Sequence, residues 1–290
     1  MVDSLYIEAS YARPGDKVVW KTIRSDLDTG AAFQSGTLRN LRLRQDSEGR
    51  LKVWGSLPKY LKGSNVDTFT RSEITEAVEK LAFEAGIDPD FTRVYGLDLA
   101  ATMPLCREVF EYFSILGERS RFIRKTYGRT GVAYESKIRT LTFYDKGEEA
   151  GIDGNLLRFE VKLKKKLKQQ LGRQVVLSDL CTNASFEQLV HRWEKEYRTV
   201  QKIKSQPMIT EPKDTKDFRS QIERIGASAA GGQETLLAQI DCWNPPADTK
   251  KYWRQLVRGW CTGGNSEEDT AMIEELDYAV EAAIEEALVS

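Results

Sequence analysis

The sequence has little of what several common enzyme classes require. Its 290 residues include one histidine, His191, which lies in an ordinary helical pattern. A serine triad away from His191, a zinc protease and a nuclease with two metal-binding histidines therefore cannot be assembled from this chain. The four cysteines are scattered, with no C-x-x-C pair. This spacing argues against a zinc cluster and for free thiols in a reducing compartment.

Long apolar runs are also missing. No stretch approaches the roughly 20 apolar residues that a membrane-spanning helix needs. The first twenty residues lack the charged and then apolar layout of a signal peptide. We therefore expect a cytoplasmic protein without a membrane partner.

The net charge of −1 conceals an asymmetry along the chain. Residues 1–170 carry 29 Lys and Arg against 24 Asp and Glu, whereas residues 171–290 carry 14 against 20. A basic first part followed by an acidic second part fits a nucleic-acid surface built mainly by the N-terminal part.

Residues 137–168 organise the rest of the chain. Their pattern predicts two strands joined by an acidic, glycine-rich connection over 147–155. Successive side chains of a strand point to opposite faces of the sheet, and apolar residues alternate here with polar ones. One face is therefore predicted to pack inward. The other is predicted to collect Tyr144, Lys146, Arg158, Glu160 and Lys162.

The remaining patterns define the fold class. Alternation predicts strands over 4–12, 17–23, 37–45, 50–58 and 91–103. Helical spacing predicts helices from Thr70 or Ser72 to Gly86 and over 104–116, 185–203, 216–227, 234–243, 248–260 and 267–288, with a loop over 57–70. No internal repeat is evident. We predict an α+β protein, with an antiparallel-rich twisted sheet and helices on one of its faces in residues 1–175, followed by an all-helical region in residues 176–290.

A basic segment with interspersed aromatic residues lies between Arg119 and Arg139, where seven basic residues accompany one acid. Such a segment can neutralise phosphates and stack on unpaired bases, although a solvated hairpin has the same composition. The second strand of the 137–168 stretch adds two more lysines. The candidate DNA-binding residues are Arg119, Arg121, Arg124, Lys125, Arg129, Lys137, Lys162 and Lys164.

The residues suited to chemistry form the pattern Y-x-K-x-x-E at 144–149, followed by R-F-E at 158–160. A tyrosine can attack a phosphodiester and keep the bond energy in a phosphotyrosine. The ordinary pKa of a tyrosine is about 10, so the attack needs help, which a divalent cation can supply. Lys146 could stabilise the phenolate or the pentavalent phosphate, and Arg158 could bind a non-bridging oxygen.

Divalent cations of this kind take carboxylate oxygens as ligands. Asp98 lies on a predicted strand between Gly96 and Ala100, which leaves open space around it. A bond to a neighbouring turn or lysine is an equally good interpretation of this aspartate. The candidate ligands for Mg²⁺ or Mn²⁺ are Asp98, Glu149 and Glu160.

These segments resemble the replication initiators of filamentous phages (the gene II/gene X type) and, more distantly, the trans-acting initiators of rolling-circle plasmids. The matching pieces are GSNV at 63–66, VYGLDLAATM at 94–103, RTLTFYDKGEE at 139–149 and LLRFEVKLKKKLKQQLG at 156–172, with a weaker match at 250–261. No match extends into the first 60 residues.

The resemblance implies an enzyme that nicks one strand of a double-stranded origin with exposed single strand and later rejoins it. It implies Tyr144 as the nucleophile, Asp98, Glu149 and Glu160 as metal ligands, and Mg²⁺ or Mn²⁺ as the cofactor. The DNA would be that of a phage or plasmid in the cytoplasm of a bacterial host cell. A host helicase and a second copy of the chain are further candidate partners.

Two other functions fit the same residues. A relaxase of a mobile element would use the same chemistry at a transfer origin. A non-catalytic DNA-binding repressor would use only the basic sheet surface, and the polar face around Tyr144 would then be a solvated surface. A covalent protein–DNA adduct distinguishes the repressor from the two enzymes.

Overall fold

The computed structural model describes residues 1–25, 32–203, 246–261 and 267–289, together with the isolated positions Lys216, Leu237, Ile240 and Asp241. Contacts divide the chain into two compact units. The first comprises Met1–Phe113, Glu118–Gln201 and Asp277–Ser290, and the second comprises Ser114–Gly117 and Lys202–Leu276. The boundary expected between residues 175 and 176 falls inside the first unit.

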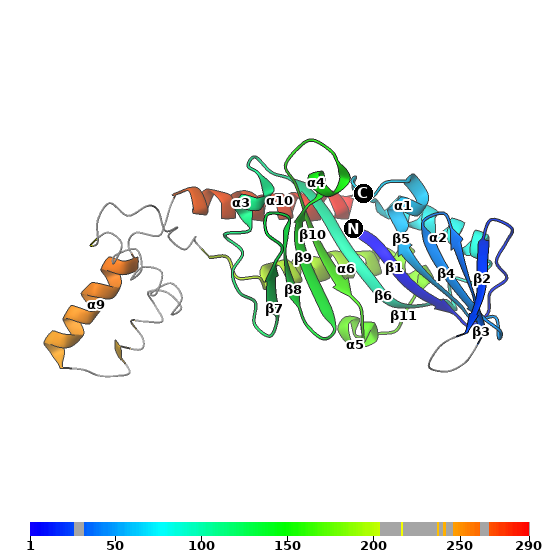
Figure 1. The fold of residues 1–290 in the computed structure, drawn as a ribbon, viewed down its shortest axis with the longest axis horizontal. Helices are drawn as coiled ribbons and strands as arrows, with labels where there is room; N and C mark the ends of the chain where they lie inside the picture. Colours follow the sequence, from blue (N-terminus) through cyan, green and yellow to red (C-terminus); the bar gives the residue numbers. More distant parts are fainter. Residues whose placement is uncertain are drawn as a thin grey trace. The chain divides into compact units, whose positions relative to one another are not determined.

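An antiparallel sheet of eleven strands forms the framework of the described part of the first unit (Figure 1). The strand order is β2-β3-β4-β5-β1-β6-β10-β9-β8-β7, and β11 pairs with β6. The strands are β1 (Val2–Ala9), β2 (Val19–Ser25), β3 (Ala32–Leu38), β4 (Leu41–Asp46), β5 (Leu51–Ser56), β6 (Arg93–Pro104), β7 (Ile123–Thr126), β8 (Gly131–Glu135), β9 (Arg139–Asp145), β10 (Leu156–Leu163) and β11 (Val175–Val176). The predicted α+β class is confirmed.

The two halves of this sheet have the same topology. β1 is followed by a meander whose last strand, β5, returns to pair with β1. β6 is likewise followed by a meander whose last strand, β10, returns to pair with β6. β1 and β6 pair with each other at the centre. The sequence does not show this repeat, because apolar alternation and turns specify a meander without requiring the same residues.

Helices follow both halves of the sheet. α1 (Leu57–Lys62) and α2 (Arg71–Ala85) follow the first half, and α5 (Leu167–Leu171), the 3₁₀ helix η1 (Leu177–Cys181) and α6 (Asn183–Arg198) follow the second. The short helices α3 (Val109–Tyr112) and α4 (Lys146–Ala150) interrupt the second meander. Two long helices, α9 (Ala247–Cys261) and α10 (Glu267–Val289), complete the described chain. No helix of this part is long and apolar enough to cross a membrane.

Aromatic packing joins β9 and β10 to α6, which crosses behind these strands in Figure 1. The rings of Phe143 and Phe159 stack with centroids 4.3 Å apart, and Phe159 also contacts Trp193 and Tyr197 of α6. Trp193 Nε1 donates a hydrogen bond of 3.1 Å to the Phe159 carbonyl. The alternation that puts these rings on the helix side puts Tyr144 and Arg158 on the opposite face.

The helix α2 begins and ends where its sequence predicts. Thr70 caps the N-terminus, and its side chain and that of Glu73 bond each other's backbone amides in a capping box. Ile74, Val78 and Leu81 are buried at helical spacing. Gly86 ends the helix in the left-handed region, with φ of 59°.

We expect Gly86→Ala to be strongly destabilising. A Cβ at residue 86 would lie 1.9 Å from the Arg13 carbonyl oxygen, whereas one at Gly63, also a left-handed helix cap, would meet nothing within 4 Å. Gly63→Ala is therefore a matched control that costs about 1–2 kcal/mol from backbone strain alone. Gly86→Ala should cost about 3–5 kcal/mol, because the clash adds to the same strain. Urea unfolding measures both, and equal losses would contradict the clash.

Several expected boundaries are wrong. The strand expected over 37–45 is the end of β3 and most of β4, separated by a turn in which Arg39 has φ of 53°. The loop expected over 57–70 contains α1. Of the helix expected over 104–116 only α3 forms, because residues 93–104 continue as β6 paired with β10. The helices expected over 216–227 and 234–243 lie outside the described residues, apart from isolated positions.

Candidate active site

Tyr144 lies on the sheet face opposite the one that packs against α6. In the register of the strands it stands opposite Gly131 of β8 on one side and Arg158 of β10 on the other. Arg158 in turn stands opposite Thr102 of β6. Directly opposed residues share a face, so these four residues form one row across the sheet. A Cβ at Gly131 would lie only 3.2 Å from Tyr144 Cβ, so this glycine makes room for the tyrosine.

The Tyr144 side chain is partly exposed, and within the described residues its hydroxyl has no hydrogen-bond partner. Burial of the ring raises the pKa of this phenol well above its usual value, the charge of Arg158 lowers it, and the nearby carboxylates of Glu160 and Glu149 raise it again. The phenol is therefore protonated at neutral pH. Its side chain is partly exposed, and its charge is coupled to two of the predicted metal ligands, Glu160 and Glu149.

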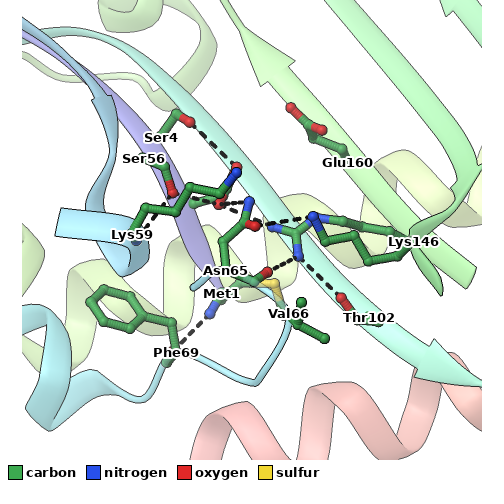
Figure 2. Close-up of polar contacts among 12 residues, drawn as sticks. Met1, Ser4, Ser56, Lys59, Asn65, Val66, Phe69, Thr102, Lys146 and Glu160 are labelled. Atoms are coloured by element: carbon green, nitrogen blue, oxygen red, sulfur yellow. Dashed lines mark hydrogen bonds and ion pairs between the residues drawn. The ribbon is translucent and has the colours of Figure 1, made fainter. Parts of the chain in front are cut away.

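A polar network surrounds Arg158. Its Nη1 donates to the carbonyl oxygen of Asn65 at 2.7 Å and to Thr102 Oγ1 at 3.1 Å, and its Nη2 pairs with Asp3 Oδ1 at 3.0 Å. The Asn65 side chain donates to Asp3 Oδ1 and accepts from Lys146 Nζ at 3.0 Å. Figure 2 shows Asn65 between Ser56 and Lys146. These contacts bring residues from distant parts of the sequence together beside Tyr144.

The structure corrects the expected roles of Lys146 and Arg158. Lys146 does not continue the strand of Tyr144, because Asp145 caps α4 and Lys146 begins that helix. The lysine is 1% exposed, and its Nζ bonds Asn65 and Glu149. Both terminal nitrogens of Arg158 are occupied, and only its buried Nε lacks a partner among the described residues. Both cations are therefore built into the network rather than open to a phosphate.

Asp98 and Glu160 form a pair of acids on the same face. Asp98 stands opposite Lys162, and Glu160 stands opposite Ala100, so the two carboxylates are diagonal neighbours on β6 and β10. Glu160 forms an ion pair of 2.9 Å with Lys162. Asp98 is 3% exposed, and its buried Oδ1 has no partner within the described residues. Burial and then the charge of Glu160 raise the pKa of Asp98 to about 7.

An unsatisfied carboxylate oxygen beside a second carboxylate fits a divalent cation. In the part of the chain that the structure describes, no group of three or more His, Cys, Asp or Glu side chains is placed to hold a metal ion. Mg²⁺ commonly takes only one or two carboxylates and completes its shell with waters and substrate phosphates. Asp98 and Glu160 meet this requirement. Glu149, the third expected ligand, is exposed and paired with Lys146.

Sequence reasoning missed three residues of the site. Asn65 links Arg158, Lys146 and Asp3, and its only signal is its place in the GSNV segment at 63–66. Asp3 reaches Arg158 because β1 lies beside β6. Tyr6 is close enough to Asp98 for that carboxylate, after burial, to raise the pKa of its phenol.

The predicted DNA-binding residues have different surroundings. Arg119 is buried and bonded to Glu196, so its expected place on the DNA surface is wrong. Arg124 donates to the Phe113 carbonyl oxygen, and Lys162 is paired with Glu160. Lys125 and Arg129 form exposed ion pairs with Glu135 and Glu108. The side chains that lie exposed with no ion pair described are those of Arg121, Lys137 and Lys164.

Tyr134 is a second tyrosine in the same half of the sheet, on β8. It stands opposite Leu141 on the helix-covered side of the sheet and is fully buried. A tyrosine in this position cannot reach a polynucleotide on the face of Tyr144.

No protein-family model matches the sequence, and comparison with curated proteins found no match. Several solved structures are similar to this chain, and two of them follow. The rolling circle replication initiator protein from Geobacillus stearothermophilus is 13% identical with a TM-score of 0.37, over 76% of this chain and 90% of that one. The Methanococcus jannaschii TBP is 12% identical with a TM-score of 0.29, over 59% of this chain and 91% of that one. Both TM-scores are too low to establish a shared fold or function.

Proposed function

We propose that this chain is a rolling-circle replication initiator that nicks one DNA strand and transfers it through Tyr144. The observation that carries the proposal is the joint placement, on one sheet face, of a partly exposed phenol and two largely buried carboxylates. One of these carboxylates has an unsatisfied oxygen. A buried core has no need for such a group, and a phosphodiester with a divalent cation would satisfy it.

In the proposed reaction Tyr144 Oη attacks the phosphorus of a phosphodiester in a single strand. The bond from phosphorus to the 3′ oxygen breaks, and the protein keeps the 5′ phosphate as a phosphotyrosine. The phenol loses its proton as the new bond forms, and the leaving 3′ oxygen takes one up. Attack of a 3′ hydroxyl on the phosphotyrosine reverses the step and rejoins a strand.

The chain's residues would assist this step in three ways. A divalent cation held by Asp98 and Glu160 would stabilise the charge on the phosphate oxygens. Arg158 opposes the effect of burial on the pKa of Tyr144, and its bonds to Asp3 and Asn65 hold it beside the phenol. The exposed Arg121, Lys137 and Lys164 are available to neutralise the phosphates of the bound strand.

The proposal is tested by trapping the covalent intermediate. The full chain is incubated with single-stranded origin oligonucleotides and Mn²⁺, denatured in SDS, and digested for peptide mapping. We expect an SDS-resistant adduct on the peptide that contains Tyr144, and no adduct when EDTA replaces Mn²⁺. DNA binding without any adduct would instead support the non-catalytic repressor.

A further inference from the structure

A polar cavity of about 450 Å³ lies in the first unit, on the side of the sheet that the helices cover. Arg139 begins β9 opposite Leu163, and Leu163 is fully buried beneath the helices, whereas Tyr144 points to the other face. The cavity is therefore separate from the candidate active site. The residues that line it include Arg119, Arg139, Gln170, Arg192, Lys195 and Glu196.

Positive charge is in excess in this cavity. Four of the lining residues are cations, and Glu196 is the one acid among them. Its buried carboxylate accepts hydrogen bonds from Arg119 and Arg139 and pairs with Arg192 at 2.7 Å. Burial alone would raise the pKa of Glu196, but the bond from Arg119 and the charges of the arginines hold it below its usual value. Even fully ionised, one carboxylate cannot neutralise three guanidinium groups and Lys195.

The cavity also contains unsatisfied polar atoms. Within the described residues, Arg119 Nη1, Arg139 Nε, Arg192 Nε and Gln170 Oε1 are buried without a hydrogen-bond partner. Arg119 is only 7% exposed, so bulk water does not replace the missing partner. A buried donor on a cation that lacks a partner is costly. The arginines that line this cavity therefore carry more donors than the single carboxylate of Glu196 accepts.

We propose that this cavity binds a phosphate group. Guanidinium donors match the oxygens of phosphate in geometry and charge, which is why arginine clusters recognise phosphate. The volume is large enough for a phosphate carried by a nucleotide or by a DNA backbone. The proposal does not rest on nicking by Tyr144, because the cavity lies on the other face of the sheet.

The test is titration of the full chain with inorganic phosphate, followed by calorimetry. We expect one site, with affinity lowered about tenfold by Lys195→Gln, because this change removes a charge-assisted hydrogen bond. Arg198→Gln is the matched control, since Arg198 lies on the same helix but outside the cavity. Lys195 is exposed and its replacement should leave the fold intact, and circular dichroism checks each variant.

Competition identifies the source of the phosphate. Displacement of inorganic phosphate by a single-stranded oligonucleotide, with the non-cleaving Tyr144→Phe protein, would assign the site to a DNA backbone. Displacement by a nucleoside monophosphate but not by the oligonucleotide would assign it to a free phosphate ester. Both results support the site. No binding of inorganic phosphate, or equal weakening by Arg198→Gln, would overturn it.

Discussion

Tyr144→Phe should reduce nicking of a supercoiled origin plasmid by at least about a thousandfold, because it removes the attacking oxygen itself. DNA binding should be unchanged, since the phenylalanine ring keeps the shape of the surface. Within the described residues the hydroxyl has no hydrogen-bond partner, so the free energy of unfolding should change by less than about 0.5 kcal/mol. Gel assays of nicking and binding, together with urea unfolding, measure the three quantities.

Tyr127→Phe is the control for this variant. Tyr127 is an exposed tyrosine between β7 and β8 in the same half of the sheet. Its replacement should leave nicking within about twofold of the wild type. Unimpaired nicking by Tyr144→Phe would remove this residue from the mechanism, while loss of nicking in both variants would point to a general disturbance of the surface.

Asp98→Asn should stabilise the free protein at alkaline pH and inactivate it. The pKa of Asp98 is raised to about 7, first by burial and then by Glu160. The folded state therefore holds its proton more tightly than the unfolded state. At a pH below the unfolded pKa of 3.8, Asp98 does not reduce the free energy of unfolding. This free energy falls as the pH rises from 3.8 to about 7 and stays low at higher pH. Removal of the titrating group should raise the free energy of unfolding at pH 8 by about 2–4 kcal/mol.

The same variant should lose its response to metal. A divalent cation that binds the ionised Asp98 and Glu160 stabilises the folded wild type by mass action, so Mn²⁺ should raise the urea midpoint at pH 8. In Asp98→Asn this shift should disappear, and nicking should fall by about a hundredfold or more. Asp90→Asn, an exposed acid just before β6, is the control. An equal Mn²⁺ shift in both variants would exclude Asp98 as a ligand.

Local patterns predicted much of the framework. The alternation over residues 137–168 placed β9 and β10 and assigned Tyr144, Arg158 and Glu160 to one face, as the register shows. The capping residues predicted both ends of α2. Prediction failed where pairing with a distant strand opposed a local preference. Residues 104–116 have helical spacing, but pairing with β10 extends β6 through Pro104 and leaves only α3 helical.

Local sequence patterns did not predict which residues from distant parts of the chain contact one another. Nothing in the sequence near Arg158 indicates that Asp3 and Asn65 occupy its terminal nitrogens. Nor does the run of basic residues after Arg119 indicate that this first arginine turns inward to Glu196 while Arg121 stays exposed. The composition of this segment predicts a basic surface. The burial of each side chain then decides which of its basic residues are exposed.

The sequence by itself determined many of the strands, both ends of α2 and the face on which the tyrosine lies, because the two-residue period of a strand and the bonds of a cap act between near neighbours. The tertiary structure alone decided which acids lie beside Tyr144, which cations remain exposed and where the arginine cavity forms. These depend on strand order and on burial, which bring together residues that are far apart along the chain.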